Sequence, residues 1–162
     1  MPLVFALLLA LLVSTSLAQT ATWQIDSNLD ARWSHVMAWD PVRERVLLFG
    51  GGGGPGVAGD TWTWNGAVWS KVAVPGPAAR FQSAMVHDVA RRRLVLFGGQ
   101  RGDTWEWDGA DWSLRVPAAS PSTRSAHAMA YDAARQRIVL FGGSNSSGCV
   151  GDTWEWDGVN WL

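Results

Sequence analysis

The segment Arg43-Glu44-Arg45-Val46-Leu47-Leu48-Phe49-Gly50-Gly51 decides the fold of this 162-residue chain, because close copies of it occur three times. The shared phenylalanine lies at positions 49, 97 and 141, so the copies are spaced by 48 and 44 residues. Each copy is followed by the pattern Asp-Thr-Trp-x-Trp-(Asn/Asp)-Gly-x-x-Trp. A period near fifty residues that carries four short β segments is typical of the blade of a β-propeller.

The first copy divides into four strand-sized pieces. We predict strands over Ser34–Trp39, Val46–Phe49 and Thr61–Trp64, and a fourth that starts at Trp69. The second piece is continuously apolar, as expected for a strand buried on both faces, whereas the third alternates. Asp-Pro and Asn-Gly pairs at the tight turns favour antiparallel hairpins. The sequence therefore predicts an all-β fold of four-stranded antiparallel blades.

The repeated glycines and tryptophans have the same register in every copy. We interpret them as structural, because packing between blades requires identical residues at identical places; stacking of sugar rings on the tryptophans is the alternative. The glycines are Gly50, Gly51, Gly98, Gly99, Gly142 and Gly143. The tryptophans are Trp62, Trp64, Trp69, Trp105, Trp107, Trp112, Trp154, Trp156 and Trp161.

The N-terminal segment has the features of a secretory signal peptide. Residues 3–13 are apolar without a break, and a small-x-small pattern ends at Ala18, so we expect cleavage after Ala18 and a secreted or periplasmic product. The apolar run is too short to span a bilayer, so no membrane span is expected in the mature chain. The predicted organisation is a signal peptide (1–18), an outer strand of an incomplete preceding blade (19–31) and blades over 32–73, 80–116 and 124–162, the last truncated in its outer strand.

The chain resembles the kelch repeat family in its Phe-Gly-Gly strand ends, its aromatic third strand and the tryptophan that follows (Trp69, Trp112 and Trp161). The sequence pattern of the repeat is similar to that of bacterial exported kelch-type proteins, and the resemblance covers residues 23–162. It implies a β-propeller that binds proteins or glycans. A minority of relatives are oxidases of the galactose oxidase type. Those enzymes need two tyrosines, one of them joined to a cysteine, whereas this chain has only Tyr131 and nothing pairs it with Cys149.

Three copies are fewer than the four to eight blades with which propellers close. We expect a partial propeller whose terminal blades expose Trp and Leu. A fragment of a longer propeller is the preferred interpretation. The alternatives are closure of the last blade by the N-terminal strand, around Trp23–Ile25, and self-association of two copies into a six-bladed ring.

Composition and motifs point away from catalysis. A net charge of −1 gives no bias toward nucleic acid, and no phosphate-cradling loop, zinc spacing or nucleophile–base pair is present. We therefore expect no enzyme activity and no cofactor. His35 and His127 occupy equivalent positions and could hold a metal ion, but no carboxylate or thiolate accompanies them. The only cysteine, Cys149, is interpreted as a loop residue; pairing between chains is the alternative.

The connections between the second and third strands, and between successive blades, vary among the copies and lie on one side of the predicted blades. Variable loops on a rigid scaffold are where binding usually resides, so we expect a protein or glycan ligand there. An arginine opens each copy on the same side and would either bind an anion or pair with the aspartate of its own blade (Asp60, Asp103 or Asp152). The candidate binding residues are Arg32, Arg80, Arg124, Gln100, Arg101, Asn145 and Ser146. A truncated product without independent function, or part of a glycan-active or oxidative enzyme with its catalytic residues elsewhere, are the alternatives.

Overall fold

A computed structural model describes residues 29–162, and this part of the chain is all-β, without any helix. The predicted signal peptide and the predicted strand near Trp23–Ile25 lie outside the described residues. Within residues 29–162, no helical segment has the length and hydrophobicity that a bilayer crossing needs.

Three antiparallel sheets carry the three sequence copies. The first sheet has the order β2 (Val36–Asp40), β3 (Arg45–Phe49), β6 (Thr61–Trp64), β7 (Trp69–Val72). The second has the order β8 (Ser83–Asp88), β9 (Arg93–Gly98), β10 (Thr104–Trp107), β11 (Trp112–Arg115). The third consists of β12 (Ala128–Asp132), β13 (Arg137–Phe141) and β16 (Thr153–Trp156), with a single bridge from Trp156 to Trp161 in place of a fourth strand.

The strands begin and end close to the predicted places, with one local difference. The first strand was expected from Ser34 but starts at Val36. Ser34 has a φ of 51°, and a residue in this left-handed conformation cannot continue an extended strand. The tight turn after β2 forms because the Asp40 carboxylate accepts the backbone N–H groups of Val42 and Arg43, at 3.0 and 3.3 Å.

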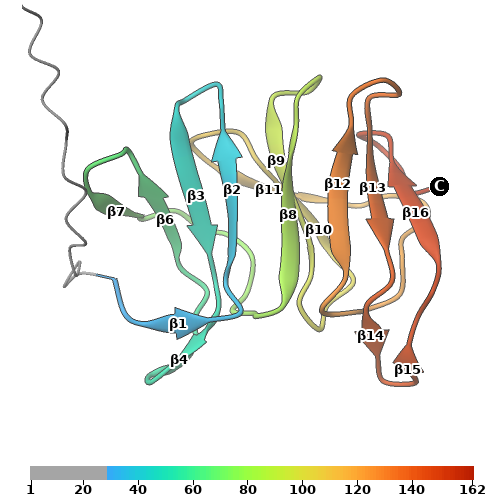
Figure 1. Cartoon of the computed structure of the whole chain (residues 1–162), viewed down its shortest axis with the longest axis horizontal. Coiled ribbons are helices and arrows are strands. Elements are labelled where there is room, and N and C mark those ends of the chain that lie inside the picture. The colour runs from blue at the N-terminus through green and yellow to red at the C-terminus, as the bar shows by residue number, and fades with distance from the viewer. Residues whose placement is uncertain (1–28) are drawn as a thin grey trace, which may run out of the picture.

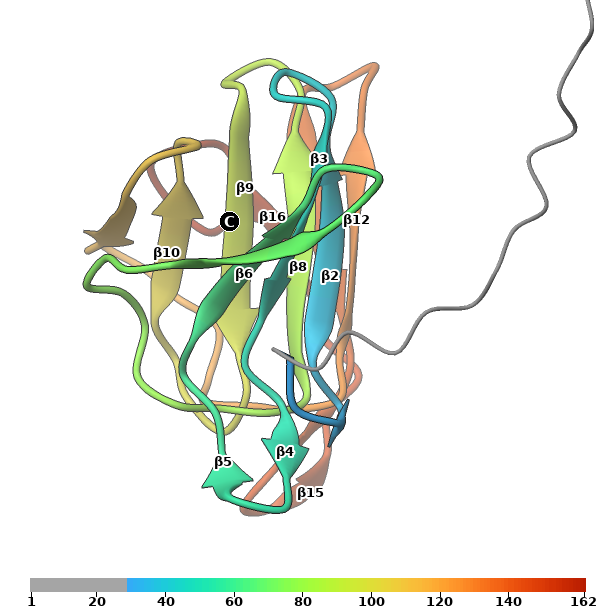
Figure 2. The ribbon, with the colours of Figure 1, turned by 90° about the vertical axis from the view of Figure 1, so that its left-hand side faces the viewer.

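The three sheets stand side by side along the longest axis of the molecule (Figure 1). Strand β8 contacts β2 on one side and β12 on the other, so the first strands of the sheets gather together. The outer strands β7 and β11 make no contact with each other in the described part of the chain. Viewed from its end, the molecule has the tight turns at one extremity and short hairpins at the other (Figure 2).

Tryptophans join each sheet to the next by the same pair of contacts. The indole of Trp112, in the second sheet, donates to Thr61 Oγ1 of the first at 2.9 Å and packs edge-on against Phe49, with ring centroids 5.5 Å apart. Trp161 repeats both contacts one sheet further on, with Thr104 at 2.9 Å and Phe97 at 5.3 Å. These side chains are buried, so Trp112 and Trp161 form part of the core between neighbouring sheets.

A second repeated contact ties the tight turns together. Arg43 extends from the first sheet and donates to the backbone carbonyl of Asp108, in the hairpin turn of the second. Arg91 does the same to Asp157 in the third sheet. The following turn residue is glycine both times, and a Cβ atom at Gly109 would overlap the Arg43 side chain.

Candidate functional site

The variable connections form one face of the molecule, opposite the tight turns. Two of them contain small hairpins that the sequence analysis did not predict: β4 (Gly52–Gly53) with β5 (Gly56–Val57), and β14 (Ser144–Asn145) with β15 (Gly148–Cys149). Strand β1 (Arg32–Trp33) pairs with β4. Such two-residue strands, rich in Gly and Ser, carry no periodic signal by which a sequence could reveal them.

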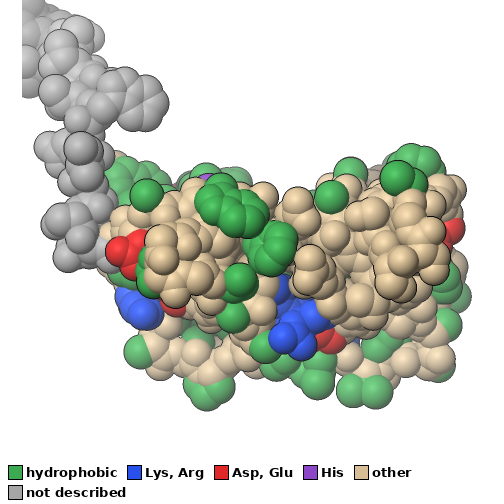
Figure 3. Space-filling model, turned by 90° about the horizontal axis from the view of Figure 1, so that it is seen from below, with side chains coloured by type: hydrophobic (Ala, Val, Ile, Leu, Met, Phe, Trp, Pro, Cys, Tyr) green, Lys and Arg blue, Asp and Glu red, His purple; other side chains and the backbone are tan. Residues whose placement is uncertain are grey.

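An open cavity of about 520 Å³ lies on this hairpin face, between the second and third sheets. Uncharged polar side chains, amides and hydroxyls, dominate its wall. The face seen from below shows mostly backbone and uncharged polar groups, with a positively charged patch near the middle (Figure 3). The lining residues are Gln82, Gln100, Thr123, Arg124, Ser125, Ser144, Asn145 and Ser146.

Backbone contacts hold the cavity wall in place. Ser125 and Ser144 exchange backbone hydrogen bonds of 2.9 Å in both directions. Gln100 has a φ of 62° and donates its backbone N–H to the Arg124 carbonyl at 3.1 Å. The side-chain oxygen of Asn145 accepts the Ser147 N–H at 2.8 Å, which leaves the amide nitrogen of Asn145 to act as a donor.

Of the predicted binding residues, four line this cavity: Gln100, Arg124, Asn145 and Ser146. Arg80 does not line it, and Arg32 lies beside a separate, smaller cavity of about 260 Å³ next to β4. Arg101 is exposed and makes a backbone bridge with Arg124. The sequence analysis missed Gln82, Thr123, Ser125 and Ser144. The signal for Gln82 was its place two residues after the arginine that opens the copy.

The arginines that open the copies pair with the aspartates of their own sheets, as the structural alternative predicted. The closest N–O distances are 2.7 Å for Arg32–Asp60 and 2.6 Å for both Arg80–Asp103 and Arg124–Asp152. The Arg124 guanidinium donates five hydrogen bonds, to Asp152 twice, to Ser122 twice and to the Gly142 carbonyl. It therefore has no donor left for a ligand, and the arginines do not form the open ring considered for anion binding.

These pairs shift the pKa values of the aspartates. Burial raises the pKa of Asp103, but the hydrogen bonds from Arg80 and Trp105 outweigh it, so the net pKa lies below its usual value. Hydrogen bonds from Arg124 and Trp154 hold the pKa of Asp152 well below the usual range. Both carboxylates are ionised at neutral pH, so Asp152 balances the charge of Arg124 beside the cavity.

The two equivalent histidines lie apart from any metal-binding group. Within residues 29–162, no set of three His, Cys, Asp or Glu side chains is arranged to hold a metal ion. His127 is buried against Phe97, with ring centroids 5.6 Å apart, and neither of its ring nitrogens has a hydrogen-bond partner there. Burial and the charge of Arg124 lower its pKa to about 4, so it is a neutral packing residue at pH 7.

Cys149 and Tyr131, which were considered for an oxidase site, lie on different elements. Cys149 is an exposed free thiol on β15. The hydroxyl oxygen of Tyr131 accepts the backbone N–H of Ala90 at 3.1 Å, which joins the second sheet to the third. Comparison of the sequence with models of known protein families gives no match, and comparison with curated proteins gives no significant match either.

Proposed function

We propose that residues 32–162 form three blades of a kelch-type β-propeller that acts as an exported binding module. The order of strands within each sheet, the gathering of β2, β8 and β12, and the identical contacts from sheet to sheet support this architecture. The apolar leader ending at Ala18 supports export.

The ligand that the hairpin face suits best is a neutral glycan. The observation that carries this proposal is the cavity of about 520 Å³ whose wall presents amides and hydroxyls. Because Asp152 pairs with Arg124, which is the only charged residue among those that line the cavity, these lining residues offer hydrogen bonds without an unpaired charge. Sugar hydroxyls both donate and accept, so they match amide and hydroxyl groups better than a charged ligand would.

Glycan-array binding by the mature chain tests this proposal. Asn145→Ala and Gln100→Ala each remove a side-chain amide from the wall and should weaken binding about tenfold, the effect of roughly one lost hydrogen bond. Ser113→Ala, on the exposed part of β11, is the matched control and should bind normally. Unchanged binding in both cavity variants would contradict the site, and cleavage or oxidation of a bound glycan would indicate an enzyme instead.

We also propose that the chain self-associates, because its third sheet exposes the surface that the other two sheets bury. Phe141 is 58% exposed, whereas Phe49 and Phe97 are fully buried at 0% beneath the next sheet. Thr153 is likewise exposed, while the equivalent Thr61 and Thr104 accept tryptophan indoles. A second copy can supply the missing sheet, since Met37 on the first sheet is 48% exposed and its counterpart Met85 only 8%.

A further inference from the structure

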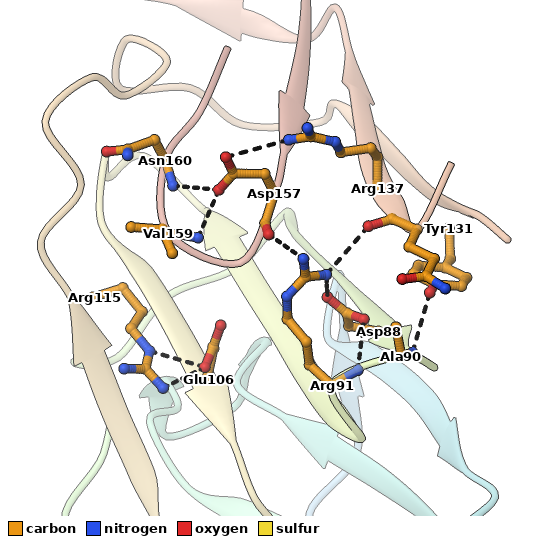
Figure 4. A network of polar contacts seen from close by, with 11 residues as sticks. Asp88, Ala90, Arg91, Glu106, Arg115, Tyr131, Arg137, Asp157, Val159 and Asn160 are labelled. Carbon is orange, nitrogen blue, oxygen red and sulfur yellow. Dashed lines mark hydrogen bonds and ion pairs between the residues drawn. The ribbon is translucent and has the colours of Figure 1, made fainter. Parts of the chain in front are cut away.

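One charged pair lies between the second and third sheets. Glu106 is buried and accepts two hydrogen bonds from Arg115, at 2.8 and 2.6 Å (Figure 4). The pair occupies the face of the second sheet that looks toward the third. Glu106 is two residues after Thr104 on β10, so both side chains point to the same neighbour.

The corresponding space between the first and second sheets is open. Thr63 stands at the position of Glu106, and Val72 at the position of Arg115, so the first sheet has neither member of the ion pair. Both residues line a cavity of about 540 Å³ on the tight-turn side of the molecule. Leu47 and Trp107 supply the apolar part of its wall.

Arg45 lines the same cavity and lacks the partner that its counterparts have. Arg93 pairs with Asp108 at 3.2 Å, and Arg137 pairs with Asp157 at 3.3 Å. In the first sheet the aspartate is replaced by Asn65, which carries no charge. Its side-chain oxygen already accepts the N–H groups of Ala67 and Val68, at 3.0 and 2.9 Å.

The other charged groups of the cavity neutralise each other. Arg43 pairs with Asp40 at 3.0 Å and donates to the Asp108 carbonyl. Arg45, by contrast, is exposed and makes no ion pair with any described residue, so the residues that line the cavity carry one unpaired positive charge. A guanidinium of this kind binds a planar carboxylate well, since two of its N–H groups match the two oxygens.

We propose that this cavity is a binding site for a small organic carboxylate with an apolar body. The carboxylate lies on Arg45, with the Thr63 hydroxyl as a further donor, and the body packs against Leu47, Val72 and Trp107. Thr63 and Val72 in its wall, and Asn65 beside Arg45, depart from the residues of the second copy, and these departures open the cavity and leave Arg45 unpaired. It lies on the opposite side of the sheets from the hairpin face, so it is independent of the glycan proposal.

Calorimetric titration with acetate, benzoate and 3-phenylpropionate tests the site, with 3-phenylpropionamide as the uncharged control. We expect 3-phenylpropionate to bind with a Kd near or below about 1 mM, acetate more weakly because it has no body to bury, and the amide at least about tenfold more weakly. Equal binding of acid and amide, or no binding of any acid up to about 10 mM, would overturn the proposal.

Asn65→Asp is the decisive variant, because it gives Arg45 the partner that both later copies possess and leaves the cavity wall unchanged. It should weaken binding of 3-phenylpropionate at least about tenfold and raise thermal stability slightly. Arg45→Gln should weaken binding equally.

The double variant Thr63→Glu, Val72→Arg introduces the pair of the second sheet and should abolish binding by filling the space. Asp111→Asn, in the exposed hairpin turn of the second sheet, is the control, and undiminished binding in the Asn65 and Arg45 variants would refute the site.

Discussion

His127 is a packing residue because it is buried beside Phe97 and the charged Arg124. His127 immediately precedes β12 and combines a close backbone approach with burial: a Cβ atom at Gly98 would lie only 2.4 Å from the His127 ring. The second copy has Ser83 at the equivalent place. A ring without hydrogen-bond partners, next to a charged arginine, must stay neutral to remain in the core.

His127 should make the stability of the protein depend on pH. Its pKa is about 4 in the folded state and near 6.5 when unfolded, so between these values the unfolded chain binds the extra proton. Neutral His127 contributes fully to the free energy of unfolding above pH 6.5, and this contribution is lost as the pH falls toward 4. At pH 5 the loss amounts to about 2 kcal/mol. Urea unfolding at pH 7.5 and 5.0 should show this loss in the wild type and a smaller one in His127→Ser. The same loss in both proteins would contradict the assignment.

The hairpin turns provide an element-scale comparison, because two of them place a glycine in a similar backbone conformation but differ in what faces that glycine. Gly66 and Gly109 have φ values of 95° and 104°, so an alanine strains the backbone similarly at either place. At Gly66 a Cβ atom would meet nothing within 4 Å, whereas at Gly109 it would displace Arg43 from the Asp108 carbonyl. The turns therefore separate backbone strain from the contact between sheets.

We expect Gly66→Ala to lower the free energy of unfolding by about 1 kcal/mol and Gly109→Ala by roughly 1 kcal/mol more. Urea denaturation measures both values. In an Arg43→Ala background the difference between the two glycine substitutions should vanish, because the contact is already absent. A difference that persists in that background would mean that the arginine is not its cause.

The elements that the sequence predicted are those that follow the repeat. Strands β3 and β6 came from the apolar run and the alternating tryptophans, and the pairing of Arg80 with Asp103 came from their recurrence on one side of every copy. The hairpins β4–β5 and β14–β15 could not be predicted, since they depend on backbone pairing without a side-chain pattern. The sequence predicted the side of the sheets on which the polar cavity lies, but not the cavity itself. Gln82 and Ser144 belong to different copies, and only the packing of two sheets brings them into one cavity wall.

At the scale of the whole molecule, the same contacts join the first sheet to the second and the second sheet to the third. The backbone N–H of Gln82 donates to the Ser34 carbonyl at 2.9 Å, and Ala126 donates to Gln82 at the same distance. These backbone hydrogen bonds, together with the tryptophan and arginine contacts, occur in the same form at the interface of the first and second sheets and at that of the second and third. The exposed face of the third sheet carries the same residues as the faces that are covered, so it is suited to the first sheet of another copy.

Replacing Phe141 by aspartate should therefore prevent the self-association that we propose. The wild type should change from monomer to dimer as its concentration rises, because two copies bring together six sheets, within the range in which propellers close. Multi-angle light scattering across a concentration series should find Phe141→Asp monomeric throughout. Val116→Asp is the matched control, since Val116 is 89% exposed but lies on the connection after β11, outside the repeated interface. Association that survives Phe141→Asp, or that Val116→Asp removes equally, would show that the contact is not the continuation of the sheet-to-sheet interface.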